Sequence, residues 1–288
     1  MASHPALLTF DLEDWYQVVG RMFGFTPSPA ERGRLPLQVG RILHLLDTHR
    51  THATFFVLGL TAAEYPGLIR DIAAAGHEIA THGFGHERVT SLTPEAFTRD
   101  LELAMDAVAT ASGHVPTGYR APAFSIDERS FWAFDILIDH GFRYDSSIFP
   151  FRGPRYGIPG FATQPGAVRA PSGRTLLELP LAVARAGPVR IPVAGGGYWR
   201  LLPGGVLRRA VRRVARQAPP MLYFHPAEFD DRRLAATMST RALNRFELKQ
   251  NLRRASIPKK LAGLLRTHRC VSISEYLQDS NALSLGGS

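Results

Sequence analysis

The sequence contains a single cysteine, Cys270, among its 288 residues. One cysteine cannot form an internal disulfide, and no Cys-x-x-Cys pair is present that could build a zinc ribbon. Any metal site in this chain must therefore use histidine, aspartate or glutamate side chains.

Long apolar runs are also missing from the sequence. No stretch approaches the ~20 residues that a membrane-spanning helix needs. The first ten residues, MASHPALLTF, lack the basic segment and following apolar segment of a secretory signal. These two absences predict a cytoplasmic protein.

The composition is that of an ordinary globular chain, with 45% hydrophobic and 20% charged residues, but its net charge is +9. Part of this charge lies in Val206–Arg216, where arginines alternate with apolar residues at a helical period. Such a helix could contact anionic lipid headgroups at the inner membrane or an acidic glycan, or could be a packed helix with a solvated basic face. Nucleic-acid binding is not predicted, because no recognised binding motif accompanies the charge.

Short apolar runs alternate with helical patterns along most of the chain, which predicts an α/β fold with a parallel sheet or barrel covered by helices. Strands are expected at 6–10, 53–58, 77–80, 117–120, 142–144 and 221–224, and helices at 36–50, 62–75, 94–112, 128–140 and 240–266. We expect one domain over 1–278, with a proline- and glycine-rich insertion at 149–203 and a loose tail at 279–288. The insertion contains two short β-like runs, at 176–179 and 189–193.

Reactive side chains follow the first predicted strand and the strand at 77–80. Asp11, Glu13 and Asp14 are three carboxylates within four residues, which would repel one another unless a cation, a proton or arginines neutralise them. His82 and His86, four residues apart, could present two imidazoles to one metal ion. Taken alone, the first group could equally be an acidic helix cap, and the second could be surface histidines.

Two further reactive residues follow later strands. Arg120 could pair with a carboxylate, or could form an ordinary salt bridge. His225 ends an apolar strand and precedes Pro226, a placement that suits a general acid or base but also suits a buried core histidine.

In this order, the motifs resemble those of the polysaccharide deacetylase family, also called carbohydrate esterase family four or the NodB homology domain. The resemblance covers roughly residues 8–229. Its motifs are Thr9-Phe10-Asp11, His82-x3-His86, Arg120-Ala121-Pro122, Tyr144-Asp145-Ser146-Ser147 and the stretch from Leu222 to His225. The strings DLEDWYQ, YDSSIFP, GGGYWRLLP and YFHPAEFD further resemble the branch found beside bacterial exosortase (PEP-CTERM) exopolysaccharide clusters.

The resemblance implies a distorted barrel of about seven βα units and a divalent metal ion, usually Zn²⁺, held by one acid and two histidines. It implies that Asp11 is the general base and that His82 and His86 are metal ligands. Arg120 would orient Asp11, and His225 would protonate the leaving amine. Asp145 would hold His225 or Arg120 in place.

The sequence departs from the family pattern at two motifs. The usual first motif has two adjacent aspartates, whereas here Asp11 is followed by Leu12. If the strand continues past Asp11, Glu13 points the same way as Asp11 and Asp14 points away, so Glu13 is the first choice for the acidic metal ligand. Asp14 is the alternative if the strand ends at Asp11. One extra residue in the last motif leaves either Leu222 or Tyr223 as the residue of the acetyl pocket. Pro122 is also expected to contact the substrate.

We therefore expect an enzyme that removes N-acetyl groups from an exopolysaccharide, or from its oligosaccharide or lipid-linked precursor, by direct attack of a metal-activated water. The first alternative is another amide hydrolase on the same scaffold, such as a deformylase for a lipid-linked amino sugar or a ureide hydrolase. The second alternative is a catalytically silent protein that only binds glycans.

Overall fold

The computed structural model describes residues 3–26, 28, 33–153, 156–187, 189–236 and 238–285. Its centre is a sheet in which seven parallel strands follow one another in space. In spatial order these strands are β10 (Met221–Phe224), β1 (Ala6–Leu12), β2 (Thr54–Val57), β3 (Glu78–Thr81), β4 (Gly118–Tyr119), β5 (Tyr144–Asp145) and β7 (Thr175–Glu178). All seven residues of β1 are buried, as expected for a strand that is covered on both sides.

Single bridges close this sheet into a distorted barrel. After β7 the chain returns to β10, where Leu181 bridges Met221 and the Ala182 N–H donates to the Met221 carbonyl at 3.1 Å. Three short additions complete the strands: β6 (Gly166–Arg169) is antiparallel to β7, β11 (Cys270–Val271) pairs with the start of β1, and β8 (Val183–Ala186) forms a hairpin with β9 (Val189–Pro192). The predicted α/β fold with a distorted seven-stranded barrel is confirmed.

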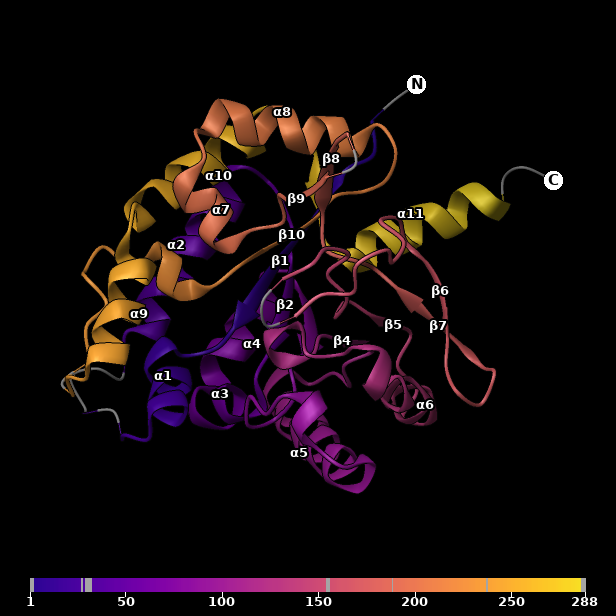
Figure 1. The fold of residues 1–288 in the computed structure, drawn as a ribbon, viewed down its shortest axis with the longest axis horizontal. Coiled ribbons are helices and arrows are strands. Elements are labelled where there is room, and N and C mark those ends of the chain that lie inside the picture. The colour runs from indigo at the N-terminus through magenta and orange to yellow at the C-terminus, as the bar shows by residue number, and fades with distance from the viewer. Residues whose placement is uncertain are drawn as a thin grey trace.

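Helices surround the barrel, with α5 and α6 on one side and α8 and α10 on the other (Figure 1). The helices are α1 (Trp15–Phe23), α2 (Leu35–Thr48), α3 (Gly59–Glu64), α4 (Pro66–Ala74), α5 (Pro94–Ser112), α6 (Trp132–Asp139), α7 (Gly196–Leu201), α8 (Gly204–Ala215), α9 (Arg241–Asn251), α10 (Ile257–Leu265) and α11 (Ile273–Leu285). Single 3₁₀ turns occur at η1 (Val89–Ser91), η2 (Pro122–Phe124), η3 (Glu128–Ser130), η4 (Pro226–Phe229) and η5 (Arg254–Ser256). No helix in the described part of the chain is long and apolar enough to cross a membrane.

Several predicted boundaries were wrong. The helix expected at 62–75 is two helices, because Pro66 cannot donate a backbone hydrogen bond and starts α4 at its first position. The segment expected to be a loose tail from 279 is helical as far as Leu285, because α11 extends from a first turn anchored by the fully buried Ile273; residues 286–288 lie outside the described residues. The predicted insertion is not wholly an addition, since β7 is a barrel strand.

Candidate active site

Glu13, His82 and His86 form a cluster at the carboxyl ends of the first and third strands. Glu13 comes directly after β1, and the two histidines lie on the loop that follows β3. Glu13 Oε2 lies 3.0 Å from His86 Nε2 and 3.7 Å from His82 Nε2, and one possible ligand atom from each residue falls within 4.8 Å of the others. Two ligands at about 2.1 Å from a tetrahedral ion are about 3.4 Å apart, so this donor set fits a zinc-like cation.

A hydrogen bond fixes the tautomer of His82 in a form that suits metal binding. His82 Nδ1 is 2.8 Å from the Arg120 carbonyl oxygen, which can only accept, so the proton resides on Nδ1. The lone pair is then on Nε2, which faces Glu13. Burial lowers the pKa of His82 to about 4, which keeps the ring neutral at neutral pH.

The loop between the two histidines has a conformation that glycine permits. Gly83 has φ +74°, and a Cβ at this position would lie 2.9 Å from Asp100 Oδ2. Asp100, on α5, accepts hydrogen bonds from the Phe84 and Gly85 N–H groups at 2.9 and 3.2 Å. His86 has φ +63°, a strained value for a non-glycine residue, so the loop bends sharply to bring its ring back toward Glu13. The sequence did not reveal the anchoring role of Asp100.

Asp11 and Arg120 form a buried ion pair beside this cluster. Arg120 Nη1 donates to Asp11 Oδ1 at 2.7 Å, and the exposed fractions of the two side chains are 2% and 0%. The guanidinium is held by Thr9 Oγ1 at 2.7 Å, by the Ser146 carbonyl at 3.1 Å and by Ser146 Oγ at 2.9 Å. Its carbon also lies 4.0 Å from the centre of the Phe56 ring. This network places Arg120 beside Asp11, and it adds Thr9 and Ser146 as partners of the guanidinium that the sequence did not point to.

Asp145 does not have the contacts expected from the sequence. Among the described residues it forms no hydrogen bond or ion pair with His225 or with the Arg120 side chain. Its oxygens accept from Ser147 Oγ at 2.7 Å and Ser147 N at 2.9 Å, and Ser147 Oγ accepts from the Ala121 N–H at 2.8 Å. Asp145 therefore supports the loop after Arg120 through Ser147. Asp145 has these contacts because its register in the sheet places it opposite Glu178 of β7. Burial, reinforced by the Asp145 charge, raises the pKa of Glu178 well above its usual value.

His225 lies close to the carboxylates of both Asp11 and Glu13. Its Nε2 is 3.6 Å from Glu13 Oε1 and 3.9 Å from Asp11 Oδ2, and the side chain is 31% exposed. The His225 N–H donates to Glu228 Oε2 at 3.1 Å, so the buried Glu228 fixes the backbone that carries the ring. Asp11 and Glu13 therefore point to the same side of β1, as the alternation of a strand predicts.

Opposing effects set the charge of the acid in the cluster. Burial penalises the ionised form of Glu13, but the charges of His86, His225 and His82 outweigh this penalty and lower the pKa of Glu13 to about 2. Glu13 is thus a carboxylate at neutral pH, as a metal ligand must be. Asp14, the alternative ligand, instead caps α1, where its Oδ1 accepts from the Tyr16 N–H at 2.8 Å.

A cleft of about 330 Å³ opens beside Glu13 and His225. Tyr223 lines it, whereas the Leu222 side chain is fully buried, because neighbouring residues of β10 point to opposite faces of the sheet. Pro122 is buried against the Gly83 backbone and does not line this cleft. The remaining walls come from elements that the sequence did not connect with the site: Trp15, Val18, Val19, Tyr156, Gly196, Gly197, Tyr198, Arg200, Ala227, Glu228, Leu234, Phe246, Gln250 and Arg254.

A close backbone approach joins one of these walls to β10. Gly195 bridges Tyr223, and a Cβ on Gly195 would lie 1.9 Å from the Tyr223 carbonyl oxygen. Only glycine fits there. The glycines of the GGGYW stretch therefore bring Tyr198 to the cleft. The sequence alone could not predict this position of Tyr198, because it depends on the packing of the stretch on β10.

Comparison with known proteins divides the chain in two. Residues 6–144 match the family model described as polysaccharide deacetylase, and residues 146–278 match a domain of unknown function, DUF3473. A peptidoglycan deacetylase of Helicobacter pylori is 30% identical over 130 residues, which are 43% of this chain and 42% of that protein. A chitooligosaccharide deacetylase of Rhizobium leguminosarum is 39% identical over 83 residues, 29% of this chain and 39% of that protein. The matches thus span about two fifths of these relatives.

The fold itself is shared with a crystal structure from Mycobacterium smegmatis, a protein whose own assignment as a polysaccharide deacetylase is provisional. That structure superposes with a TM-score of 0.64 at 22% identity, covering 99% of this chain and 93% of the other. The part of the chain that resembles the polysaccharide deacetylase family is thus residues 6–144, which carry both the histidine pair and the Asp11–Arg120 pair.

Proposed function

We propose that this protein is a metal-dependent hydrolase that removes the N-acetyl group from N-acetylhexosamine units of a glycan. One observation carries the proposal. Asp11 and His225, a possible base and a possible acid, lie beside a Glu13, His82 and His86 cluster whose donor set and spacing suit a divalent cation. Amide hydrolysis needs these components together: an activated water, stabilisation of the developing oxyanion and a proton for the amine.

A divalent cation bound by Glu13, His82 and His86 would lower the pKa of a water molecule and polarise the amide carbonyl. Asp11 is placed to take the proton that the water loses as its oxygen bonds to the acetyl carbon. Arg120 keeps Asp11 Oδ1 occupied at 2.7 Å, so that Oδ2, on the side of His225, is the oxygen that receives this proton.

His225 completes the reaction by donating a proton to the nitrogen as the carbon–nitrogen bond breaks. Its ring is partly exposed at the edge of the cleft, where a sugar amine could approach it. The products are acetate and a free amino sugar. No serine or cysteine nucleophile is needed, so the acetyl group is never attached to the protein.

The cleft suits a sugar as its occupant. Its 330 Å³ falls within the usual range for ligand sites of about 300–1,000 Å³. Trp15, Tyr198 and Tyr223 offer flat apolar faces, and Arg200 and Gln250 offer hydrogen-bonding groups. The peptidoglycan and chitooligosaccharide deacetylases to which the chain is similar support an N-acetylated glycan as the substrate class.

Within that class we favour an exopolysaccharide or its oligosaccharide or lipid-linked precursor, Zn²⁺ as the ion, and a cytoplasmic location. The substrate rests on the resemblance of four sequence strings to the exosortase-linked branch, and the metal rests on the two imidazole ligands, which suit zinc.

The decisive experiment measures acetate released from N-acetylated chito-oligosaccharides by the purified full-length protein, with formylated amino sugars and cyclic ureides as competing substrates. We expect acetate release that a chelator abolishes and that added Zn²⁺ restores. A preference for the formylated or cyclic amides would support a different amide hydrolase. Tight oligosaccharide binding without acetate release by the zinc-loaded protein would support a silent glycan-binding protein.

A further inference from the structure

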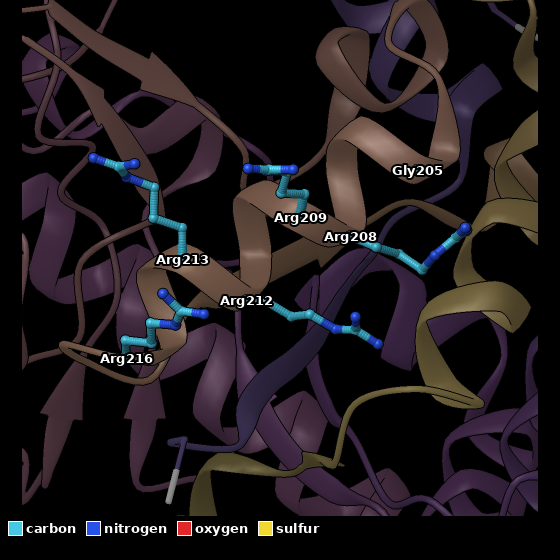
Figure 2. Close-up of a pocket in the computed structure, with 6 residues that line it drawn as sticks. All are labelled: Gly205, Arg208, Arg209, Arg212, Arg213 and Arg216. Carbon is cyan, nitrogen blue, oxygen red and sulfur yellow. The ribbon is translucent and has the colours of Figure 1, made fainter. Parts of the chain in front are cut away.

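One face of α8 carries only arginines and small or apolar residues. Its opposite face, formed by Leu207, Val211 and Ala215, is buried against the barrel core. Figure 2 shows the arginine side chains spreading outward from successive turns of the helix. They surround a hollow of about 620 Å³ whose lining consists of Gly205, Arg208, Arg209, Arg212, Arg213 and Arg216.

These arginines have no acidic partners within the part of the chain that the structure describes. The only hydrogen bond that any of their side chains makes there is the one from Arg212 Nη2 to the Thr267 carbonyl, at 3.3 Å. Several arginines elsewhere do pair with a carboxylate, among them Arg21, Arg34, Arg41, Arg129, Arg174 and Arg269. The sequence explains the contrast, because no aspartate or glutamate occurs between Glu178 and Glu228.

We propose that this face of α8 docks on a bilayer surface containing anionic phospholipids. Planar guanidinium groups that have no acidic partner among the described residues present paired N–H donors that match phosphate oxygens. Val206, 51% exposed, lies three and seven residues before Arg209 and Arg213, and so shares their face. Leu201, at the end of the preceding α7, is 53% exposed. Apolar side chains beside a basic helical face are what an interfacial helix needs to enter the headgroup layer.

The same face is poorly suited to nucleic acid. Its lining contains no aromatic side chain on which a base could stack, and single-strand binding sites combine basic grooves with such rings. The helix itself lies on the outside of the molecule, where a bilayer surface could reach it (Figure 1).

The position of α8 would leave the catalytic cleft open when the helix is docked. The Ala215 carbonyl, at the end of α8, accepts from the His4 N–H at 2.8 Å, close to the start of β1, whereas Asp11 and Glu13 lie at the other end of that strand. α7, which contributes Tyr198 to the cleft, directly precedes α8. Docking would thus hold the cleft beside the membrane without covering it. The inference does not depend on the proposed hydrolysis.

Cosedimentation with lipid vesicles tests this surface. The full-length protein would be mixed with vesicles of phosphatidylcholine alone, or of phosphatidylcholine with about a third phosphatidylglycerol, at low and high salt. The test variant is Arg209→Glu with Arg213→Glu. The matched control is Arg70→Glu with Arg99→Glu, on α4 and α5, which makes the same change in net charge on the far side of the barrel (Figure 1).

We expect the protein to bind the anionic vesicles only, and salt to weaken this binding. The affinity of the α8 variant should be roughly tenfold lower or more, since each basic residue near such a surface raises membrane affinity about fivefold. The control variant should bind like the unchanged protein. An equal loss in both variants would show that net charge alone is responsible and would overturn the proposal. So would failure to bind anionic vesicles, or a stronger α8-dependent affinity for single-stranded oligonucleotides. Unchanged thermal unfolding of the α8 variant would verify that it is folded.

Discussion

Replacing Arg120 with methionine should destabilise the protein strongly, because it leaves the Asp11 carboxylate buried without its partner. Asp11 is 2% exposed. The substitution also removes the hydrogen bonds that the guanidinium donates to Thr9 Oγ1, Ser146 Oγ and the Ser146 carbonyl. Breaking a buried ion pair from one side costs about 3–5 kcal/mol. For a chain of this size each kcal/mol corresponds to about 2–4 °C, so we expect the midpoint of thermal unfolding to fall by roughly 6–20 °C.

Urea unfolding of chelator-treated protein, with every variant measured at the same pH, would quantify this loss. Adding Asp11→Asn to Arg120→Met should recover part of it, with a coupling free energy of about 0.5–3 kcal/mol between the two positions. The control is Arg174→Met, whose pairs with Asp135 and Asp139 lie on the surface and should contribute about 0–1 kcal/mol. Simple additivity of the Arg120 and Asp11 substitutions would refute the reasoning.

Three other substitutions separate the roles within the site. Asp11→Asn should lower acetate release by about 10²–10⁴-fold while metal content, measured by mass spectrometry, stays near that of the unchanged protein; activity within tenfold would show that Asp11 is not the base. His82→Ala should lose both bound metal and activity, and a variant that still holds one ion per chain would argue against His82 as a ligand. Gly83→Ala should cost about 1–2 kcal/mol in urea unfolding, because φ +74° disfavours a side chain and its Cβ would meet Asp100. Metal affinity, measured by titration calorimetry, should decline as the pH falls. The charges of Glu13 and its neighbours outweigh the effect of burial and raise the pKa of His86, so His86 is the first of the possible ligands to gain a proton.

The barrel and the central residues of the site were predictable from the sequence for one reason. In a parallel sheet, residues that directly follow strands meet at one edge, so the carboxylates after β1 and the histidines after β3 had to lie close together. The choice of Glu13 over Asp14 also followed from strand alternation, and the geometry agrees with it: Glu13 approaches both histidines, whereas Asp14 caps α1.

The supporting contacts were not predictable, because they depend on register and packing between distant segments. Asp145 was expected to hold Arg120 or His225 in place, yet its hydrogen bonds go to Ser147. Its position opposite Glu178 is set by the pairing of β5 with β7, which no local pattern specifies. Similarly, Tyr198 reaches the cleft only because Gly195 packs on the backbone of β10.

The division of the chain between two family models does not correspond to a division of the site. Residues 6–144 supply the possible metal ligands and base, but the possible acid, His225, and the cleft residue Tyr223 come from the segment that matches the domain of unknown function. That segment also contributes two of the seven barrel strands, β7 and β10, and β10 pairs directly with the strand that carries Asp11. The second half is therefore part of the barrel rather than an appendage. Differences in substrate among proteins that share this second segment should accordingly arise in the cleft wall formed by α7 and α9, because the possible metal ligands and the possible base belong to the other half.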